Sequence, residues 1–264
     1  MDFIKFLGTA GARFVVIKQL RSSGGLWMSL QGLNILVDPG PGALVRCLSS
    51  RPRLDPEKLD VVIVTHRHLD HANDVNVIVE AMTRGGFKRR GVLFAPADAL
   101  QEKEPVLQSY LHGSLEAIHC LEENKKYSLQ GKDGVFSFTT PVKHHHPVET
   151  YGLKFDLPYG SLGIIADTAF FPELAAHYPC SLLILNVVVA QDHTTKKIYH
   201  LNYSQAIEII RQVRPQTAIL THFGMTMLQQ KPWVLAEKAS RELGSQVVAA
   251  RDGMLWEIPS LQSI

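Results

Sequence analysis

Residues 65–71 read THRHLDH and directly follow the apolar run 61–64. Three imidazoles and one carboxylate lie within this segment: His66, His68, Asp70 and His71. Neutral histidine and ionised aspartate are natural ligands of zinc and its first-row neighbours. A strand that ends at residue 64 would be followed by a turn that contains these residues. The first two histidines could then face one metal ion, while the aspartate and the last histidine turn towards a second.

Three later apolar runs also end in candidate ligands. Residues 136–147 (FSFTTPVKHHHP) contain three consecutive histidines, 161–168 (SLGIIADT) contain Asp167, and 217–223 (TAILTHF) contain His222. Taken alone, Asp167 could equally be a helix N-cap, because a polar residue after a strand often caps the next helix. Together with the first motif, the set favours metal binding.

The motif His-x-His-x-Asp-His, followed in order by a histidine, an aspartate and a histidine, resembles the signature of the metallo-β-lactamase superfamily. Residues 6–11 (FLGTAG) and 38–42 (DPGPG) are similar to its glycine-containing turns. The resemblance implies an α/β fold, a four-layer αββα sandwich of two mixed sheets flanked by helices. It also implies one domain over residues 1–264, with the metal at one edge of the sandwich.

The same resemblance implies two divalent metal ions, with Zn²⁺ expected and Mn²⁺ or Fe²⁺ as alternatives. The implied ligands of the first ion are His66, His68 and His146. Those of the second are Asp70, His71 and His222, and the two ions would share Asp167 as a bridge. Asp70 is also expected to orient the attacking hydroxide or carry protons. Asp38 would support a ligand histidine through its second nitrogen.

The triple histidine leaves two candidates for the third motif. Side chains alternate along a strand, so His144 and His146 would share one face and His145 would take the other. The stretch HPVETYG resembles ribonuclease Z-like members, in which the ligand lies six residues before the glycine. That layout favours His146, with His144 as the alternative ligand or a supporting donor. His200, just before a predicted helix, is either a general acid or phosphate contact or a structural cap partner.

By resemblance we expect a binuclear metal-dependent hydrolase whose metal-bridged hydroxide attacks a phosphodiester. Hydrolysis of a carboxylic ester, lactone or thioester at the same centre is the alternative, and a non-catalytic metal-binding scaffold is a further one. Ribonuclease Z commonly carries a long arm for transfer RNA between its third and fourth motifs. Here Gly152 and Asp167 are only fifteen residues apart. A small or cyclic phosphodiester is therefore expected rather than transfer RNA.

Composition agrees with a small-molecule substrate. The 264 residues are 45% hydrophobic and 20% charged, with a net charge of +2, so the chain is no general polycation for nucleic acid. Three widely spaced cysteines and no recognisable secretory signal favour a cytoplasmic location. No apolar run is long enough to cross a bilayer. A homodimer is the oligomer that the resemblance suggests.

Short apolar runs alternate with amphipathic stretches along the whole chain. Strands are predicted over 3–7, 15–18, 27–30, 35–37, 61–64, 92–95, 136–142, 151–155, 162–166, 182–186, 218–221, 246–249 and 254–258. Helices are predicted over 41–48, 72–84, 97–107, 113–117, 172–177, 203–213 and 232–243. The loop 21–25 is a candidate substrate contact at the mouth of the site.

Overall fold

Two mixed sheets of seven strands each form the centre of the protein, and the computed structural model describes residues 2–101, 103–131, 134–191 and 198–258. The first sheet has the order β14-β1-β2-β3-β4-β5-β6. Its strands are β1 (Phe3–Phe6), β2 (Leu26–Leu30), β3 (Leu33–Val37), β4 (Val61–Ile63), β5 (Val92–Pro96), β6 (Ala117–Leu121) and β14 (Leu255–Glu257). Strands β3 to β6 run parallel to one another, and the other pairs are antiparallel.

The second sheet has the order β13-β12-β11-β10-β9-β8-β7. Its strands are β7 (Lys125–Gly131), β8 (Gly134–Thr140), β9 (Leu153–Leu157), β10 (Gly160–Ile165), β11 (Leu182–Asn186), β12 (Thr217–Thr221) and β13 (Gln246–Ala249). Strands β10 to β13 are parallel, while β7 to β10 form an antiparallel meander. Each sheet therefore has a parallel half whose strand ends point to one edge.

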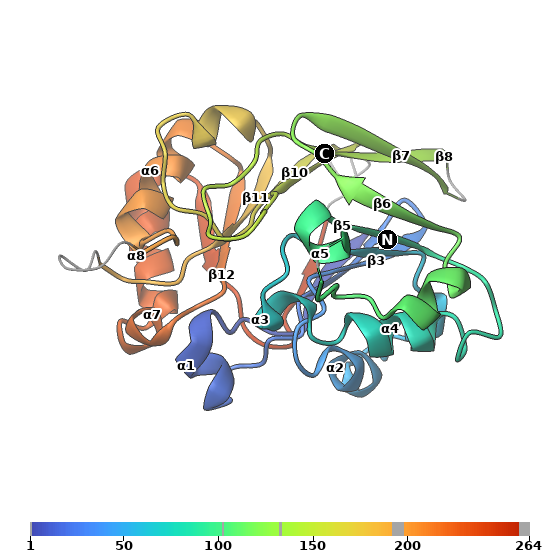
Figure 1. Ribbon diagram of the computed structural model, residues 1–264. Coiled ribbons are helices and arrows are strands. Elements are labelled where there is room, and N and C mark those ends of the chain that lie inside the picture. The colour runs from blue at the N-terminus through green and yellow to red at the C-terminus, as the bar shows by residue number, and fades with distance from the viewer. Residues whose placement is uncertain (1, 102, 132–133, 192–197, 259–264) are drawn as a thin grey trace.

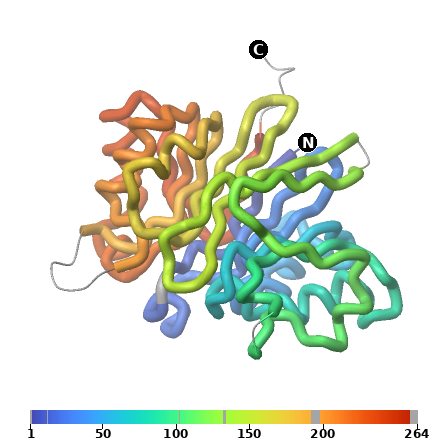
Figure 2. The backbone as a smooth tube through the Cα atoms, turned by 45° about the horizontal axis from the view of Figure 1, so that its top comes forward, coloured from blue at the N-terminus to red at the C-terminus, as the bar shows by residue number. Residues whose placement is uncertain are grey.

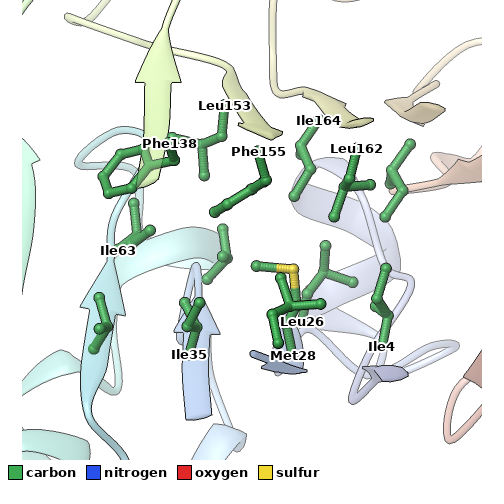
Figure 3. Close-up of a cluster of buried hydrophobic side chains, with 14 of the residues drawn as sticks. Ile4, Leu26, Met28, Ile35, Ile63, Phe138, Leu153, Phe155, Leu162 and Ile164 are labelled. Carbon is green, nitrogen blue, oxygen red and sulfur yellow. The ribbon is translucent and has the colours of Figure 1, made fainter. Parts of the chain in front are cut away.

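Apolar side chains from the facing surfaces of the two sheets form the central core. Ile4, Met28 and Ile63 of the first sheet face Phe138 and Phe155 of the second (Figure 3). All five are fully or almost fully buried. Burial of such side chains contributes roughly 1.5–3 kcal/mol each, so the contact between sheets is a main source of stability.

Helices cover the outer face of each sheet. They are α1 (Ala12–Ile17), α2 (Ala43–Ser49), α3 (Leu69–Ala72), α4 (Val75–Met82), α5 (Ala97–Gln101), α6 (Tyr203–Val213), α7 (Met225–Gln229) and α8 (Pro232–Leu243), with short 3-10 turns η1 (Pro56–Lys58), η2 (Ser109–Ser114) and η3 (Leu174–His177). Helices α2 and α4 pack on the first sheet and α6 and α8 on the second, each over its own apolar cluster. The helices of the two layers lie on opposite sides of the molecule (Figures 1 and 2). The predicted αββα sandwich is confirmed.

Local sequence explains where the two longest helices begin and end. Asn202 and Gln205 form a capping box at the start of α6. Helix α8 has Pro232 in its first turn and ends at Gly244 in the left-handed conformation, with φ 70°. Proline at the first helical position and glycine just past the last one are the usual helix boundaries.

Some predicted elements are wrong. Residues 15–18 belong to helix α1 and the turn after it, although three β-branched residues favoured a strand. The helix predicted over 113–117 is instead the end of η2 and the start of strand β6. Strand β7 and helix α7 were not predicted, and α5 ends at Gln101 rather than residue 107. These segments lie at sheet edges or on the surface, where burial imposes little pattern on the sequence.

Candidate metal centre

The candidate ligands lie beyond the carboxyl ends of strands, in loops or, for Asp70 and His71, in the short helix α3. Strand β4 leads into residues 65–71, β10 leads to Asp167, and β12 leads to His222, while His146 lies in the loop between β8 and β9. Parallel neighbours end at the same edge of a sheet, so the loops of each sheet are brought together. Because the two sheets face each other, the loops of both meet at one edge of the sandwich.

A backbone link between the two sheets fixes the position of His222. Ala10 and Phe223 form a parallel bridge, in which the N–H of Phe223 donates to Thr9 O over 2.8 Å. The N–H of Gly11 donates to Phe223 O over 3.0 Å. A Cβ at Gly11 would overlap the carbonyl group of His222, so only glycine allows this approach. His222 itself has φ 60°, a left-handed conformation that is uncommon for a side chain of this size.

Four clusters of three possible ligands occur among the described residues, one of which joins His200 to His146 and Asp167, and two of which match the predicted ligand groups. In each group the nearest ligand atoms lie within 4.8 Å of one another. The first group is His66, His68 and His146, and the second is Asp70, His71 and His222. Within the first, His68 Nδ1 lies 3.1 Å from His146 Nε2. This spacing is short enough for both nitrogens to contact one ion.

Asp167 lies between the two groups and is almost fully buried. Its Oδ2 is 3.8 Å from His66 Nε2 in the first group and 3.6 Å from His71 Nε2 in the second. Its Oδ1 is 3.4 Å from His222 Nε2. One carboxylate therefore reaches both groups, which is the position that a bridging ligand needs.

Asp38 organises the histidines of both groups from behind. Its Oδ1 accepts the N–H of Thr65 over 2.7 Å, and its Oδ2 accepts the Thr65 hydroxyl over 2.8 Å. The same Oδ2 lies 2.9 Å from His71 Nδ1, and the Thr65 oxygen lies 3.0 Å from His66 Nδ1. Since the Thr65 hydroxyl donates to Asp38, it accepts from His66. In their neutral form both imidazoles then carry their proton on Nδ1 and present an unprotonated Nε2 to the centre.

Three of the atoms presented to the centre have no hydrogen-bond partner among the described residues. The Nε2 atoms of His66, His71 and His222 are buried and form no hydrogen bond among the described residues. Buried polar atoms without a partner are rare and costly. His146 follows the same arrangement, since its Nδ1 lies 2.9 Å from Tyr199 O and leaves Nε2 for the centre. Imidazole nitrogens and carboxylate oxygens of this arrangement fit one or more divalent metal ions.

Burial and neighbouring charges shift the ionisation of the cluster. Burial lowers the pKa of His66 well below its ordinary value and lowers the pKa of His146 to about 4. Burial opposes charge on His71 too, but the surrounding carboxylates, Asp70 foremost, raise its pKa well above the ordinary value. Burial would raise the pKa of Asp167, yet the adjacent imidazoles hold it well below its usual range. Neutral imidazole and ionised carboxylate are the forms that bind metal.

Comparison with known proteins identifies the family. Residues 33–223 match the family described as the beta-lactamase superfamily domain. A protein of Methanocaldococcus jannaschii, MJ1374, is 31% identical over 263 residues, which cover 97% of this chain and 94% of that protein. The chain belongs to the metallo-β-lactamase superfamily.

Solved structures agree with this assignment. The metallo-β-lactamase fold protein YhfI of Bacillus subtilis superposes with a TM-score of 0.78 at 22% identity, over 97% of this chain and 99% of that one. A diphosphatase from the PhnP family superposes with a TM-score of 0.69 at 19% identity, over 98% of both chains. Proteins called ribonuclease Z or tRNase Z are also among the similar proteins. The predicted superfamily and its ribonuclease Z-like layout are confirmed.

In this superfamily member the three consecutive histidines have three different surroundings. His146 joins the first ligand group, whereas the buried His144 places its Nε2 2.8 Å from Tyr178 Oη. His145 packs its ring on Phe171, with centroids 4.2 Å apart. Strand β8 ends at residue 140, so the expected strand alternation over 144–146 is wrong. His144 is in none of the ligand groups among the described residues, and burial lowers its pKa to about 3.

His200 lies beside the cluster, as expected. Its Nε2 is 3.6 Å from Asp167 Oδ2, and its Nδ1 is 3.1 Å from Tyr199 O. Its side chain is 21% exposed, while that of Asp167 is 3% exposed. His200 therefore lies at the open side of the centre, where a bound molecule could reach it. Burial lowers its pKa.

The loop 21–25 lies next to the centre, since Ser23 and Gly25 line the same cavity as Asp70, His71 and His222. Ser22 and Ser23 are buried, while Arg21 and Gly25 are partly exposed, and a substrate contact of this loop stays a prediction. Asn186 was not predicted as a site residue, yet its amide nitrogen donates to Asp167 Oδ1 over 2.9 Å. A signal existed: Asn186 is the one polar residue inside the apolar run 182–190.

No helix of the described ranges combines the length and the apolar character needed to cross a membrane.

Proposed function

We propose that the protein is a binuclear metal-dependent hydrolase of small phosphodiesters. The observation that carries the proposal is the convergence of seven donor side chains, three of which present a buried Nε2 atom without a hydrogen-bond partner among the described residues. In this proposal the first ion has the ligands His66, His68 and His146, the second has Asp70, His71 and His222, and Asp167 is shared between them. Zn²⁺ is the favoured metal because histidine nitrogen dominates the ligand set.

Bound divalent ions would supply Lewis acidity and a water of lowered pKa, which is the chemistry that phosphodiester hydrolysis needs at neutral pH. The protein's own side chains would orient the attacking water and transfer protons. Asp70 is 21% exposed in its side chain and lies 3.6 Å from His222, at the open side of the centre. It would orient the attacking water and accept its proton.

His200 would act on the leaving group. Its Nδ1 faces a backbone carbonyl, so Nε2 is the atom that would exchange a proton with substrate. General acid catalysis by a placed imidazole contributes typically 10²–10⁴-fold. Asp167 would keep a protonated His200 in place through its Oδ2, which is 3.6 Å away.

A small substrate is favoured for two reasons. Residues 152–167 are taken up by strands β9 and β10 and their tight turn, which leaves no room for an inserted arm. One structurally similar protein is a diphosphatase, whose name indicates a small phosphate substrate. Phosphodiester hydrolysis therefore takes precedence over acyl transfer at the same centre.

The test is metal analysis of the purified protein together with a substrate panel. We expect about two ions per chain and metal-dependent hydrolysis of bis-p-nitrophenyl phosphate. Asp70→Ala and His200→Ala should each lower kcat at least 10²-fold. His177→Ala, a change on the distant turn η3, should leave kcat unchanged.

Two results would contradict the proposal in different ways. Turnover of a lactone or thioester without any phosphodiester turnover would assign the centre to acyl transfer. Failure to retain any divalent ion at neutral pH would leave a scaffold without the proposed chemistry.

A further inference from the structure

Asn186 lies between two of the proposed ligands, at the end of the central strand of three. Strand β11 pairs in parallel with β10 on one side and with β12 on the other. In this register Leu185 lies beside Ile165, and Asn186 lies beside Thr221. The residues that follow the flanking strands are the proposed ligands Asp167 and His222. Three neighbouring strand ends thus present a carboxylate, an amide and an imidazole to one place.

The amide contacts one oxygen of the shared carboxylate. Asn186 Nδ2 donates to Asp167 Oδ1 over 2.9 Å, and the same Oδ1 faces His222 Nε2. The other oxygen, Oδ2, faces His66, His71 and His200. The two oxygens therefore have different surroundings, and rotation of the carboxylate would exchange them.

A fixed rotation needs a directional contact. The terminal torsion of aspartate is broad and nearly two-fold, so packing alone selects its angle only weakly. Asn186 donates to Asp167 Oδ1 and, unlike the neighbouring His222, is neither a proposed metal ligand nor titratable. Its amide donates at every pH and brings no charge to a centre that already contains three carboxylates, Asp38, Asp70 and Asp167.

We propose that Asn186 is a positioning residue, which sets the plane of the Asp167 carboxylate and so its ability to be shared by two ions. This inference rests on the proposed metal centre and adds to it the residue that orients its bridging ligand. A hydrogen-bonding neighbour of a metal ligand typically changes metal affinity 10- to 100-fold when it is removed.

The test compares Asn186→Ala and Asn186→Asp with the wild-type protein. The first removes the side chain, and the second keeps its shape but replaces the neutral amide donor with a carboxyl group. Asn34→Ala is the matched control, because its exposed amide donates to Lys58 O far along strand β3 from the centre. Each protein is stripped with a chelator and titrated with Zn²⁺ against a chromophoric competitor. The visible spectrum of the Co²⁺-loaded form then reports ligand geometry independently of activity.

We expect Asn186→Ala to bind the weaker of the two Zn²⁺ ions about 10- to 100-fold less tightly and to alter the Co²⁺ spectrum. Asn186→Asp should alter the spectrum too, and Asn34→Ala should match wild type in both measurements. If Asn186→Ala keeps wild-type affinity and spectrum, the inference is overturned. Should that variant not fold, an unchanged spectrum for Asn186→Asp overturns it instead. A wild-type chain that binds no Zn²⁺ would reject the proposed function itself, which separates the two failures.

Discussion

Replacement of Asp38 tests how far the metal centre depends on residues that are not ligands. Its carboxylate accepts three hydrogen bonds, from the N–H and the hydroxyl of Thr65 and from His71 Nδ1. Asp38→Ala removes both acceptor oxygens, and with them all three hydrogen bonds, at once. The hydroxyl can rotate to another partner, but the amide N–H and the imidazole N–H remain buried.

The magnitude follows from those two orphaned donors. Each buried donor that loses its partner costs about 1–3 kcal/mol, so the free energy of unfolding of metal-free Asp38→Ala should fall by about 2–6 kcal/mol. Asp38→Asn is more informative because it keeps the shape. If its NH₂ faces His71, Nδ1 must accept, and the proton moves to Nε2, the atom proposed to bind metal. If instead it faces Thr65, two N–H donors oppose each other, and we expect a loss of about 1–3 kcal/mol.

The assay is urea unfolding of the metal-free proteins, paired with Zn²⁺ titration. Zinc affinity of the group that contains His71 should fall about 10- to 100-fold in Asp38→Asn. The control is Asp156→Asn, which breaks a half-exposed pair with Lys154 and should cost less than about 1 kcal/mol. Wild-type zinc affinity and wild-type stability in Asp38→Asn would refute the reasoning, because the carboxylate would then have no orienting role.

Three further predictions concern the surroundings of the same centre. His146→Ala should reduce the metal content from about two ions to about one, whereas His144→Ala should retain both, as elemental analysis of the purified variants will determine. Gly40→Ala should lower the free energy of unfolding by more than about 3 kcal/mol in a denaturant titration, because the added Cβ would overlap the carbonyl oxygens of Asp70 and Ser23. The metal-free protein should lose stability as pH falls from about 6.5 to 3, since His144 has a folded pKa of about 3 and binds its proton more readily when unfolded.

The sign of the pH effect follows from proton uptake. Between those two pH values His144 binds its proton more readily in the unfolded chain. The contribution of His144 to stability is therefore complete above pH 6.5 and declines below it, by at most about 1.4 kcal/mol per pH unit. His144→Asn should decline less steeply in urea unfolding at several pH values. Equal slopes for variant and wild type would contradict the burial argument.

For the metal count, equal loss in the His144 and His146 variants would contradict the separation of their roles. A well-tolerated alanine at residue 40 would contradict the close approach of the backbones.

The ligand candidates could be found from the sequence because two simple rules coincide with the resemblance to the superfamily, which implied the later ligands and their order. Few residue types bind divalent metals, and the relevant ones directly follow buried runs such as 61–64 and 161–166. Buried parallel strands read as continuous apolar stretches, so their ends are visible in the sequence. Since such ends share one edge of a sheet, residues as distant as His66 and His222 were expected together, and the structure brings them together.

The errors arise where the local pattern and the tertiary environment disagree. Val15, Val16 and Ile17 are β-branched and so favour a strand by propensity. Yet only Val15 is buried, and Ile17 is 74% exposed, because α1 lies on the surface with one side against the body of the protein. The chain reaches α1 directly from Gly11, whose backbone is already paired with Phe223, and it turns there into a helix. A long-range contact of this kind has no local signature.

Strand β7 was missed for the opposite reason. Its burial alternates, with Lys125, Lys126 and Ser128 exposed and Tyr127 buried, so it contains too few apolar residues to resemble a strand. It forms the last strand of the second sheet, where charged side chains on an unpaired edge discourage pairing with another chain. Its pairing with β8, rather than its own composition, defines it.

The groups that orient the ligands were less predictable than the ligands themselves, and chemistry explains why. A ligand must be one of a few residue types, whereas an orienting partner needs only a donor or an acceptor. Here these partners are the hydroxyl of Thr65, the backbone carbonyl of Tyr199 and the amide of Asn186. Such groups occur throughout the chain, so their role depends on position alone. Asp38 was anticipated because its turn resembles a glycine-containing turn of the superfamily, but Asn186 became recognisable only when three strand ends were seen side by side.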